Sequence, residues 1–127
     1  MAIDPSAPPA AISVLAVEDD PAVAFAIVTV LRGAHCDITP AGSMEEALAT
    51  IARQPRGFDV VITDNNMPGG NGRDLVRRLR GSGYSGKVVV LSACVSPEEE
   101  NEYRELGVSE VVPKPFSLGE LRRAVGL

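Results

Sequence analysis

Residues 60–72 of the chain read VVITDNNMPGGNG, and the single acidic residue of this segment is Asp64. The β-branched run before Asp64 indicates a buried strand. The Asn-, Pro- and Gly-rich residues after it indicate a loop. Asp64 is therefore expected at the carboxyl end of a buried strand, where open α/β sheets place their ligand sites.

Charged residues also follow two other apolar runs. The run from Ile12 to Val17 leads directly into Glu18 and Asp19, and a shorter run ending at Val112 leads into Pro113 and Lys114. The carboxyl ends of parallel strands meet at one edge of a sheet. We therefore expect these two acids, Asp64 and the lysine to form a single site.

The composition favours one globular domain that binds neither nucleic acid nor a membrane. The chain has 127 residues, of which 45% are hydrophobic, and a net charge of −5, which argues against a nucleic-acid surface. Its longest uncharged apolar stretch, Ala22 to Leu31, is too short for a membrane segment. No signal peptide is recognisable, and the two cysteines fit a reducing compartment, so we expect a cytoplasmic protein.

Five strand patterns alternate with five helix patterns, which predicts an α/β fold with a doubly wound five-stranded parallel sheet covered on both faces. Residues 1–11 are rich in Pro and Ala and are expected to form a flexible arm or linker, and residues 12–127 the folded domain. Ser43, Ser96 and Ser117 each precede a glutamate by three residues, which predicts capping boxes. The predicted strands are 12–17, 36–41, 58–63, 87–91 and 110–112, and the predicted helices are 21–32, 43–54, 73–80, 97–106 and 118–127.

The acids at the strand ends are suited to a hard cation. Glu18, Asp19 and Asp64 would place about three negative charges in one pocket, which either raises their pKa values or binds a cation. Oxygen ligands with room for water suit Mg²⁺ better than zinc, since no Cys or His is placed to help. Asn66 is expected to add its backbone carbonyl to this site.

The same edge carries groups suited to phosphoryl transfer. An oxygen of Asp64 is a candidate nucleophile toward a phosphoryl group, with the cation screening the repulsion between the two anions. Lys114 is expected to neutralise charge on the phosphoryl oxygens. Ser92 supplies a hydroxyl just past the fourth strand, and the small Ala93 beside it leaves access.

These positions resemble the receiver domains of two-component response regulators, which share the doubly wound fold of the chemotaxis regulator. The resemblance covers Ile12 to the C-terminus, and it implies the flavodoxin-like strand order 2-1-3-4-5. It also implies Mg²⁺-dependent transfer of phosphate from a histidine kinase or a phosphotransfer domain to the aspartate, followed by slow self-dephosphorylation. The matching residues are Glu18-Asp19, Asp64 with Met67-Pro68 and Asn71-Gly72, Ser92-Ala93, and Lys114-Pro115-Phe116.

One position departs from the resemblance. Receivers usually carry Tyr or Phe three residues before the lysine, where the ring swings inward on activation, but here that residue is Val111. We therefore expect the response to phosphate to concentrate in the loop 92–97 and the start of the fourth helix. The resemblance also implies a cis peptide bond between Lys114 and Pro115, which the small trans preference of X–Pro bonds permits.

The first predicted helix is a candidate partner surface. It has no charged residue between Asp20 and Arg32, and its 100° periodicity places Phe25 and Val28 outside a buried stripe. Receivers use this helix to dock the phosphodonor, which predicts contacts from Ala22, Phe25 and Ala26. The alternative is that the N-terminal arm folds over this surface.

Other functions remain open. An aspartyl-phosphate phosphatase would also use an aspartate at a strand end, but it would normally need a second acid at the position of Asn66. A phosphate-independent pseudo-receiver would be a pure binding module, and the intact acidic set and lysine argue against it. We expect a free-standing regulator or the receiver part of a hybrid kinase, and no enzyme activity beyond self-phosphorylation and self-dephosphorylation.

Overall fold

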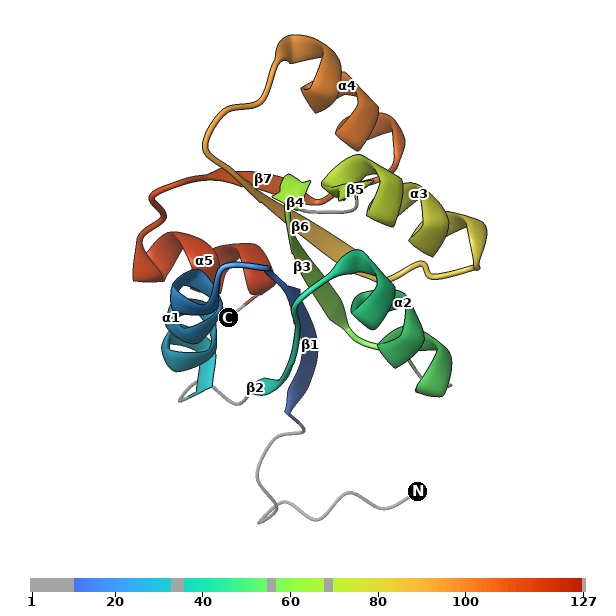
Figure 1. Ribbon diagram of the computed structural model, residues 1–127. Helices are drawn as coiled ribbons and strands as arrows, with labels where there is room; N and C mark the ends of the chain where they lie inside the picture. Colours follow the sequence, from blue (N-terminus) through green and yellow to red (C-terminus); the bar gives the residue numbers. More distant parts are fainter. Residues whose placement is uncertain (1–10, 33–35, 55–56, 68–69, 127) are drawn as a thin grey trace, which may run out of the picture.

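The computed structural model describes residues 11–32, 36–54, 57–67 and 70–126, so most of the expected N-terminal arm lies outside the described residues. Five parallel strands form one sheet in the order β2-β1-β3-β6-β7 (Figure 1). The sheet strands are β1 (Ile12–Val17), β2 (Cys36–Ala41), β3 (Val60–Asp64), β6 (Lys87–Ser92) and β7 (Glu110–Pro113). The helices are α1 (Pro21–Arg32), α2 (Met44–Arg53), α3 (Gly72–Gly81), α4 (Pro97–Glu105) and α5 (Leu118–Val125).

The predicted topology is confirmed. Counting only the strands of this sheet along the chain, the spatial order is 2-1-3-4-5, as in flavodoxin-like folds. The order reverses beside β1 and β3, which pair in parallel with Val17 opposite Thr63. Both strands therefore end at the same edge, which brings Glu18 and Asp64 to the point where doubly wound sheets bind ligands.

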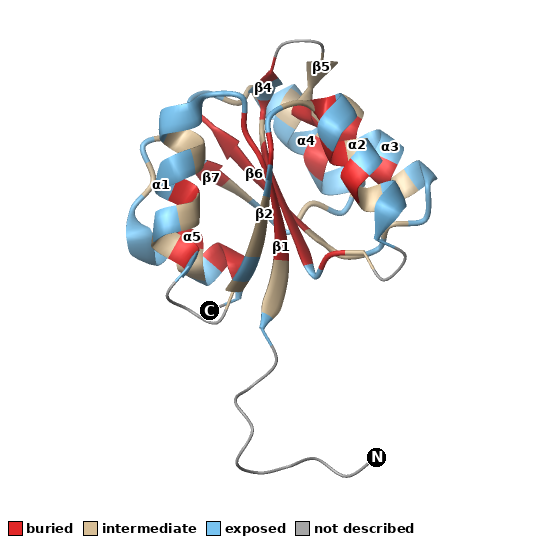
Figure 2. Ribbon diagram, turned by 60° about the horizontal axis from the view of Figure 1, so that its bottom comes forward, coloured by how far each residue is buried: buried red, intermediate tan, exposed pale blue. Residues whose placement is uncertain are grey.

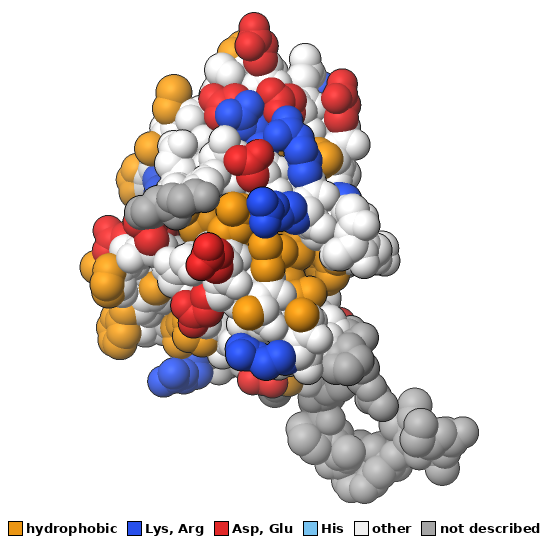
Figure 3. Space-filling model, turned by 45° about the vertical axis from the view of Figure 1, so that its right-hand side comes forward, with side chains coloured by type: hydrophobic (Ala, Val, Ile, Leu, Met, Phe, Trp, Pro, Cys, Tyr) orange, Lys and Arg blue, Asp and Glu red, His pale blue; other side chains and the backbone are white. Residues whose placement is uncertain are grey.

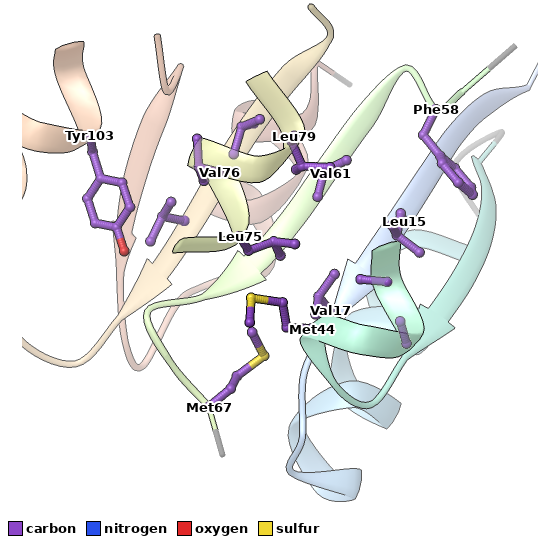
Figure 4. Close-up of a cluster of buried hydrophobic side chains, with 14 residues drawn as sticks. Leu15, Val17, Met44, Phe58, Val61, Met67, Leu75, Val76, Leu79 and Tyr103 are labelled. Atoms are coloured by element: carbon purple, nitrogen blue, oxygen red, sulfur yellow. The ribbon is translucent and has the colours of Figure 1, made fainter. Parts of the chain in front are cut away.

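Helices cover both faces of the sheet, and each face has its own apolar layer. Ile27 of α1 and Leu121 of α5 belong to one layer, whereas Met44, Leu75 and Tyr103 of α2, α3 and α4 belong to the other. Figure 2 shows the central strands buried and the outer helix faces exposed, and Figure 4 shows the second layer. Strands buried on both faces explain why their sequences are apolar without alternation.

The helix starts follow the serine signals, with one complete capping box. Ser43, Ser96 and Ser117 each accept a hydrogen bond from the backbone N–H three residues later. Only at Ser96 does the glutamate, Glu99, also accept from the cap residue's own N–H. Glu46 instead accepts from the N–H of Gly42, so the predicted box at Ser43 is half formed.

Two local predictions differ from the structure. The segment after Asp64, predicted to be a loop, contains a short antiparallel hairpin, β4 (Asn66–Met67) with β5 (Gly70–Asn71). Val28, predicted to face outward, is half-buried, because the buried residues of α1 are Ile27 and Leu31. At 100° per residue Val28 lies only about 60° from Leu31 around the helix axis, which places it at the edge of the buried stripe rather than opposite to it.

Candidate functional site

The three predicted acids converge at the carboxyl edge of the sheet. Glu18 follows β1 and is 3% exposed, Asp64 ends β3, and Asp19 is exposed. One carboxylate oxygen from each lies within 4.8 Å of the others. Burial raises the pKa of Glu18, the hydrogen bond from Lys114 opposes this shift, and the charge of Asp64 adds to it. The cluster thus concentrates negative charge at a partly closed position.

Lys114 supplies the positive charge of the site. It follows β7, and its Nζ lies 2.9 Å from Asp64 Oδ1 and 3.2 Å from Glu18 Oε1. Burial lowers the pKa of Lys114, but its hydrogen bonds to Asp64 and Glu18 together with their negative charges outweigh burial and raise it. The predicted cis bond between Lys114 and Pro115 is confirmed. The lysine therefore stays charged and holds the two carboxylates together.

Ser92 reaches the same edge, but its hydroxyl is engaged elsewhere. The side chain is buried at the end of β6, where Oγ donates to the carbonyl of Cys94 (2.9 Å) and accepts from the Cys94 N–H (3.2 Å). Its backbone carbonyl accepts from the N–H of Lys114 at 2.8 Å. Ser92 therefore fixes the start of the following loop and links the loop to the lysine.

Asn65 and Asn66 follow Asp64 and point to different surroundings. Asn66 is exposed in the short hairpin, and the contribution of its carbonyl to a cation site stays a prediction. Asn65 is buried, and its backbone N–H donates to the carbonyl of Leu91 (2.9 Å) and lies 3.0 Å from Asp64 Oδ1. The Asn65 N–H therefore contacts the same oxygen of Asp64 that Lys114 contacts.

Gly72 allows the hairpin to return closely to the site. Its N–H donates to the carbonyl of Asn65 at 2.8 Å. A Cβ at this position would lie 2.7 Å from the Asp64 carbonyl and 2.8 Å from the Tyr103 hydroxyl. Residue 72 must therefore be glycine for the backbone to pack here.

Tyr103 was missed as a site residue by sequence reasoning. It is 1% exposed, and its hydroxyl donates to the side-chain carbonyl of Asn65. Burial raises the pKa of Tyr103 above its ordinary value. The only sequence signal was one aromatic residue in an otherwise polar helix, which suggests a buried anchor without naming its partner.

Ion pairs join α3 and α4 on the surface next to the site. Arg73 and Arg77 of α3 contact Glu102 of α4 at 2.9 and 2.6 Å. Figure 3 shows acidic and basic side chains mixed over these helices. Some of the arginines of α3 thus pair with glutamates of α4, and partly exposed pairs of this kind contribute little stability individually.

The predicted partner surface on α1 is exposed. Phe25 is 73% exposed, the most exposed large hydrophobic side chain in the described part of the chain, and Ala22 and Ala26 beside it are also exposed. Among the helices of the described residues, none combines the length and apolar character needed to cross a membrane.

Comparisons with known proteins identify the family. The model of the response regulator receiver domain matches residues 14–126. The probable transcriptional regulatory protein TcrX of Mycobacterium tuberculosis is 33% identical over 87% of this chain and 46% of its own length. The DNA-binding response regulator MtrA of Mycolicibacterium smegmatis is 38% identical over 85% of this chain and 46% of its own. This chain thus spans less than half the length of these curated relatives.

Solved structures show the same fold. The chemotaxis protein CheY4 of Vibrio cholerae superposes with a TM-score of 0.83 at 30% identity, covering 91% of this chain and 97% of CheY4. A response regulator receiver protein from Pseudomonas putida gives a TM-score of 0.85 at 32% identity, covering 91% and 96%. The family match, the strand order and the acidic pocket agree, and the chain belongs to the receiver domains of two-component response regulators.

Proposed function

We propose that this domain is a phosphorylation-operated switch whose phosphoacceptor is Asp64. The observation that carries the proposal is the contact of Asp64 Oδ1 with Lys114 Nζ at 2.9 Å, beside two further carboxylates. The lysine leaves the other oxygen of Asp64 available as a nucleophile and supplies charge for an incoming phosphoryl group.

The donor would be a phosphohistidine of a histidine kinase or phosphotransfer protein. An oxygen of Asp64 forms a bond to phosphorus as the bond from phosphorus to the imidazole nitrogen breaks. The imidazole leaves with the bonding electron pair and takes a proton from water. Lys114 would hold one phosphoryl oxygen, and the Ser92 hydroxyl would bind another after releasing its hydrogen bond to the Cys94 carbonyl.

The donor set fits Mg²⁺. The three carboxylates have oxygens within 4.8 Å of one another, and the ammonium group of Lys114 offsets only one of their charges, so negative charge remains in excess. All the available ligand atoms are hard oxygens. Glu18, Asp19, Asp64 and the carbonyl of Asn66 would hold the ion. Bound there, Mg²⁺ would screen the repulsion between the carboxylate and the phosphoryl oxygens.

The exposed face of α1 is proposed as the docking surface for the donor. Phe25 with Ala22 and Ala26 forms an uncharged patch, which suits an apolar partner surface. Phe25→Ser should slow phosphotransfer from a protein donor and leave labelling by acetyl phosphate unchanged. An equal loss of labelling rate with the protein donor and with acetyl phosphate would exclude a docking role for this patch.

The central test is intact mass after incubation with acetyl phosphate and Mg²⁺. The wild type should gain one phosphoryl group and Asp64→Asn should gain none, because an amide oxygen is a far poorer nucleophile. Asp59→Asn, at the opposite end of the same segment, is the matched control and should label normally. Equal labelling of Asp64→Asn would refute the assignment, and a wild type that never labels would favour a phosphate-independent binding module.

A further inference from the structure

A buried polar contact connects the phosphoacceptor segment to α4. Asn65 is directly bonded to Asp64 in the chain and is 2% exposed. Its side-chain oxygen accepts from the Tyr103 hydroxyl, and its Nδ2 donates to Glu99 Oε2 at 3.4 Å. One amide group therefore joins the residue next to the nucleophile to two positions on one helix.

Tyr103 is the main apolar anchor of α4. It is the only buried residue of this helix, whose sequence is otherwise almost entirely polar. Its ring packs in the layer that contains Leu75 and Val76 of α3 (Figure 4). Its hydroxyl donates to Asn65. The position of α4 against the sheet therefore depends strongly on this one side chain.

Glu99 ties the same contact to the beginning of the helix. Its Oε1 accepts from the N–H of Ser96 at 3.2 Å, which completes the capping box. The hydrogen bonds from Ser96 and then from Asn65 lower the pKa of Glu99, which keeps it ionised. A change at Asn65 thus reaches both the start and the middle of α4.

An open pocket borders Tyr103 between α4 and β7. A cavity of about 290 Å³ between α4 and β7 is lined by Tyr103, Arg104, Val108 and Val111. An aromatic side chain at residue 111 would take up part of this space, whereas valine leaves it open. The side of Tyr103 that faces this pocket is therefore not closely packed against β7.

We propose that Asn65 and Tyr103 form the coupling element through which phosphorylation of Asp64 moves α4. This inference rests on the proposed function. The backbone nitrogen of Asn65 lies 3.0 Å from Asp64 Oδ1, so a phosphoryl group on Asp64 would change the charge next to Asn65. An amide can present either its oxygen or its NH₂ group, so its bond to the tyrosine has two states that the charge can bias.

The test compares backbone amide shifts with and without beryllofluoride and Mg²⁺ in matched variants. Tyr103→Phe removes only the hydroxyl, and Tyr84→Phe is the control, since the Tyr84 hydroxyl bonds to the Phe58 carbonyl away from the site. In the wild type and in Tyr84→Phe, residues 97–105 should shift together with the site residues. In Tyr103→Phe the site should still shift, with changes in residues 97–105 reduced at least about twofold.

A double variant separates coupling from folding. Tyr103→Phe leaves the side-chain oxygen of the buried Asn65 without its hydrogen-bond donor, and Asn65→Leu in the same chain removes that unpaired oxygen. The double variant should regain thermal stability and still show the reduced α4 response. An undiminished α4 response in Tyr103→Phe, or its recovery in the double variant, would overturn the coupling alone. A wild-type site that ignores beryllofluoride would overturn the proposed function, and the coupling with it.

Discussion

Lys114→Met tests how the site is held together before any phosphate arrives. The substitution keeps most of the side-chain volume and removes the ammonium that contacts Asp64 at 2.9 Å and Glu18 at 3.2 Å. Hydrogen bonds to charged groups are worth about 1.5–3 kcal/mol each. Because the lysine side chain is 23% exposed, the lower value applies to each bond, and the loss in unfolding free energy is about 3 kcal/mol. For 127 residues this lowers the melting midpoint by about 11 °C.

The loss of unfolding free energy in Lys114→Met should become smaller as the pH falls from 7 toward 5. The pKa of Glu18 is raised in the folded state, so the folded state binds this proton more tightly than the unfolded state. Its ionisation therefore costs stability as pH rises, and acidification toward pH 5 restores stability. Without the lysine the pKa of Glu18 rises further, so the variant should gain more on acidification than the wild type.

The assay is urea unfolding in EDTA at pH 7 and pH 5, with Lys87→Met as control. Lys87 is the other lysine of the chain, and in the described residues its ammonium forms no ion pair. The difference in unfolding free energy between Lys114→Met and the wild type should be smaller at pH 5 than at pH 7. Lys87→Met should lower the unfolding free energy much less at both pH values. An equal difference at the two pH values, or one no larger than the control's, would show that the lysine does not hold the acids.

Three further outcomes are expected. Burial raises the pKa of Tyr84 to about 12 and also raises the pKa of Tyr103, so the unfolding free energy should fall as the pH rises above 10, where the phenols of the unfolded chain ionise. Phenolate absorbance of the Tyr84→Phe and Tyr103→Phe variants checks this prediction. A phenol that titrates at its ordinary pKa in the folded state would contradict it. Millimolar Mg²⁺ should raise the melting midpoint of the wild type and raise that of Asp19→Asn less, whereas an unchanged wild-type midpoint counts against the cation site. Arg80 donates four hydrogen bonds to backbone carbonyls, so Arg80→Met should lower the unfolding free energy by about 3 kcal/mol, and the exposed Arg78→Met should leave it nearly unchanged in the same urea titration.

The positions of Glu18, Asp64 and Lys114 were predictable because each follows an apolar run. Parallel strands end at a common edge, so the order of residues along the chain was enough to place these side chains together. The same reasoning could not give the orientation of the Ser92 hydroxyl, which depends on the path of the following loop.

The contact between Asn65 and Tyr103 was beyond sequence reasoning for a different reason. The two residues are 38 positions apart, and their meeting depends on the rotation of α4 against the sheet. That rotation is set by packing between α3 and α4, which periodicity in a mostly charged helix does not define. Val28 illustrates the same limit on α1, where the centre of the buried stripe is decided by the neighbouring layer.

The sheet separates the two helical layers completely, with α1 and α5 on one face and α2, α3 and α4 on the other. A phosphodonor seated on Phe25 would therefore leave α4 uncovered (Figure 1). Delivery of the phosphoryl group by the donor and binding of a target to the phosphorylated domain need not use the same surface. On the proposed function, one domain could then be phosphorylated while its target is already bound, and the duration of a signal would be set by the lifetime of the acyl phosphate rather than by an exchange of partners.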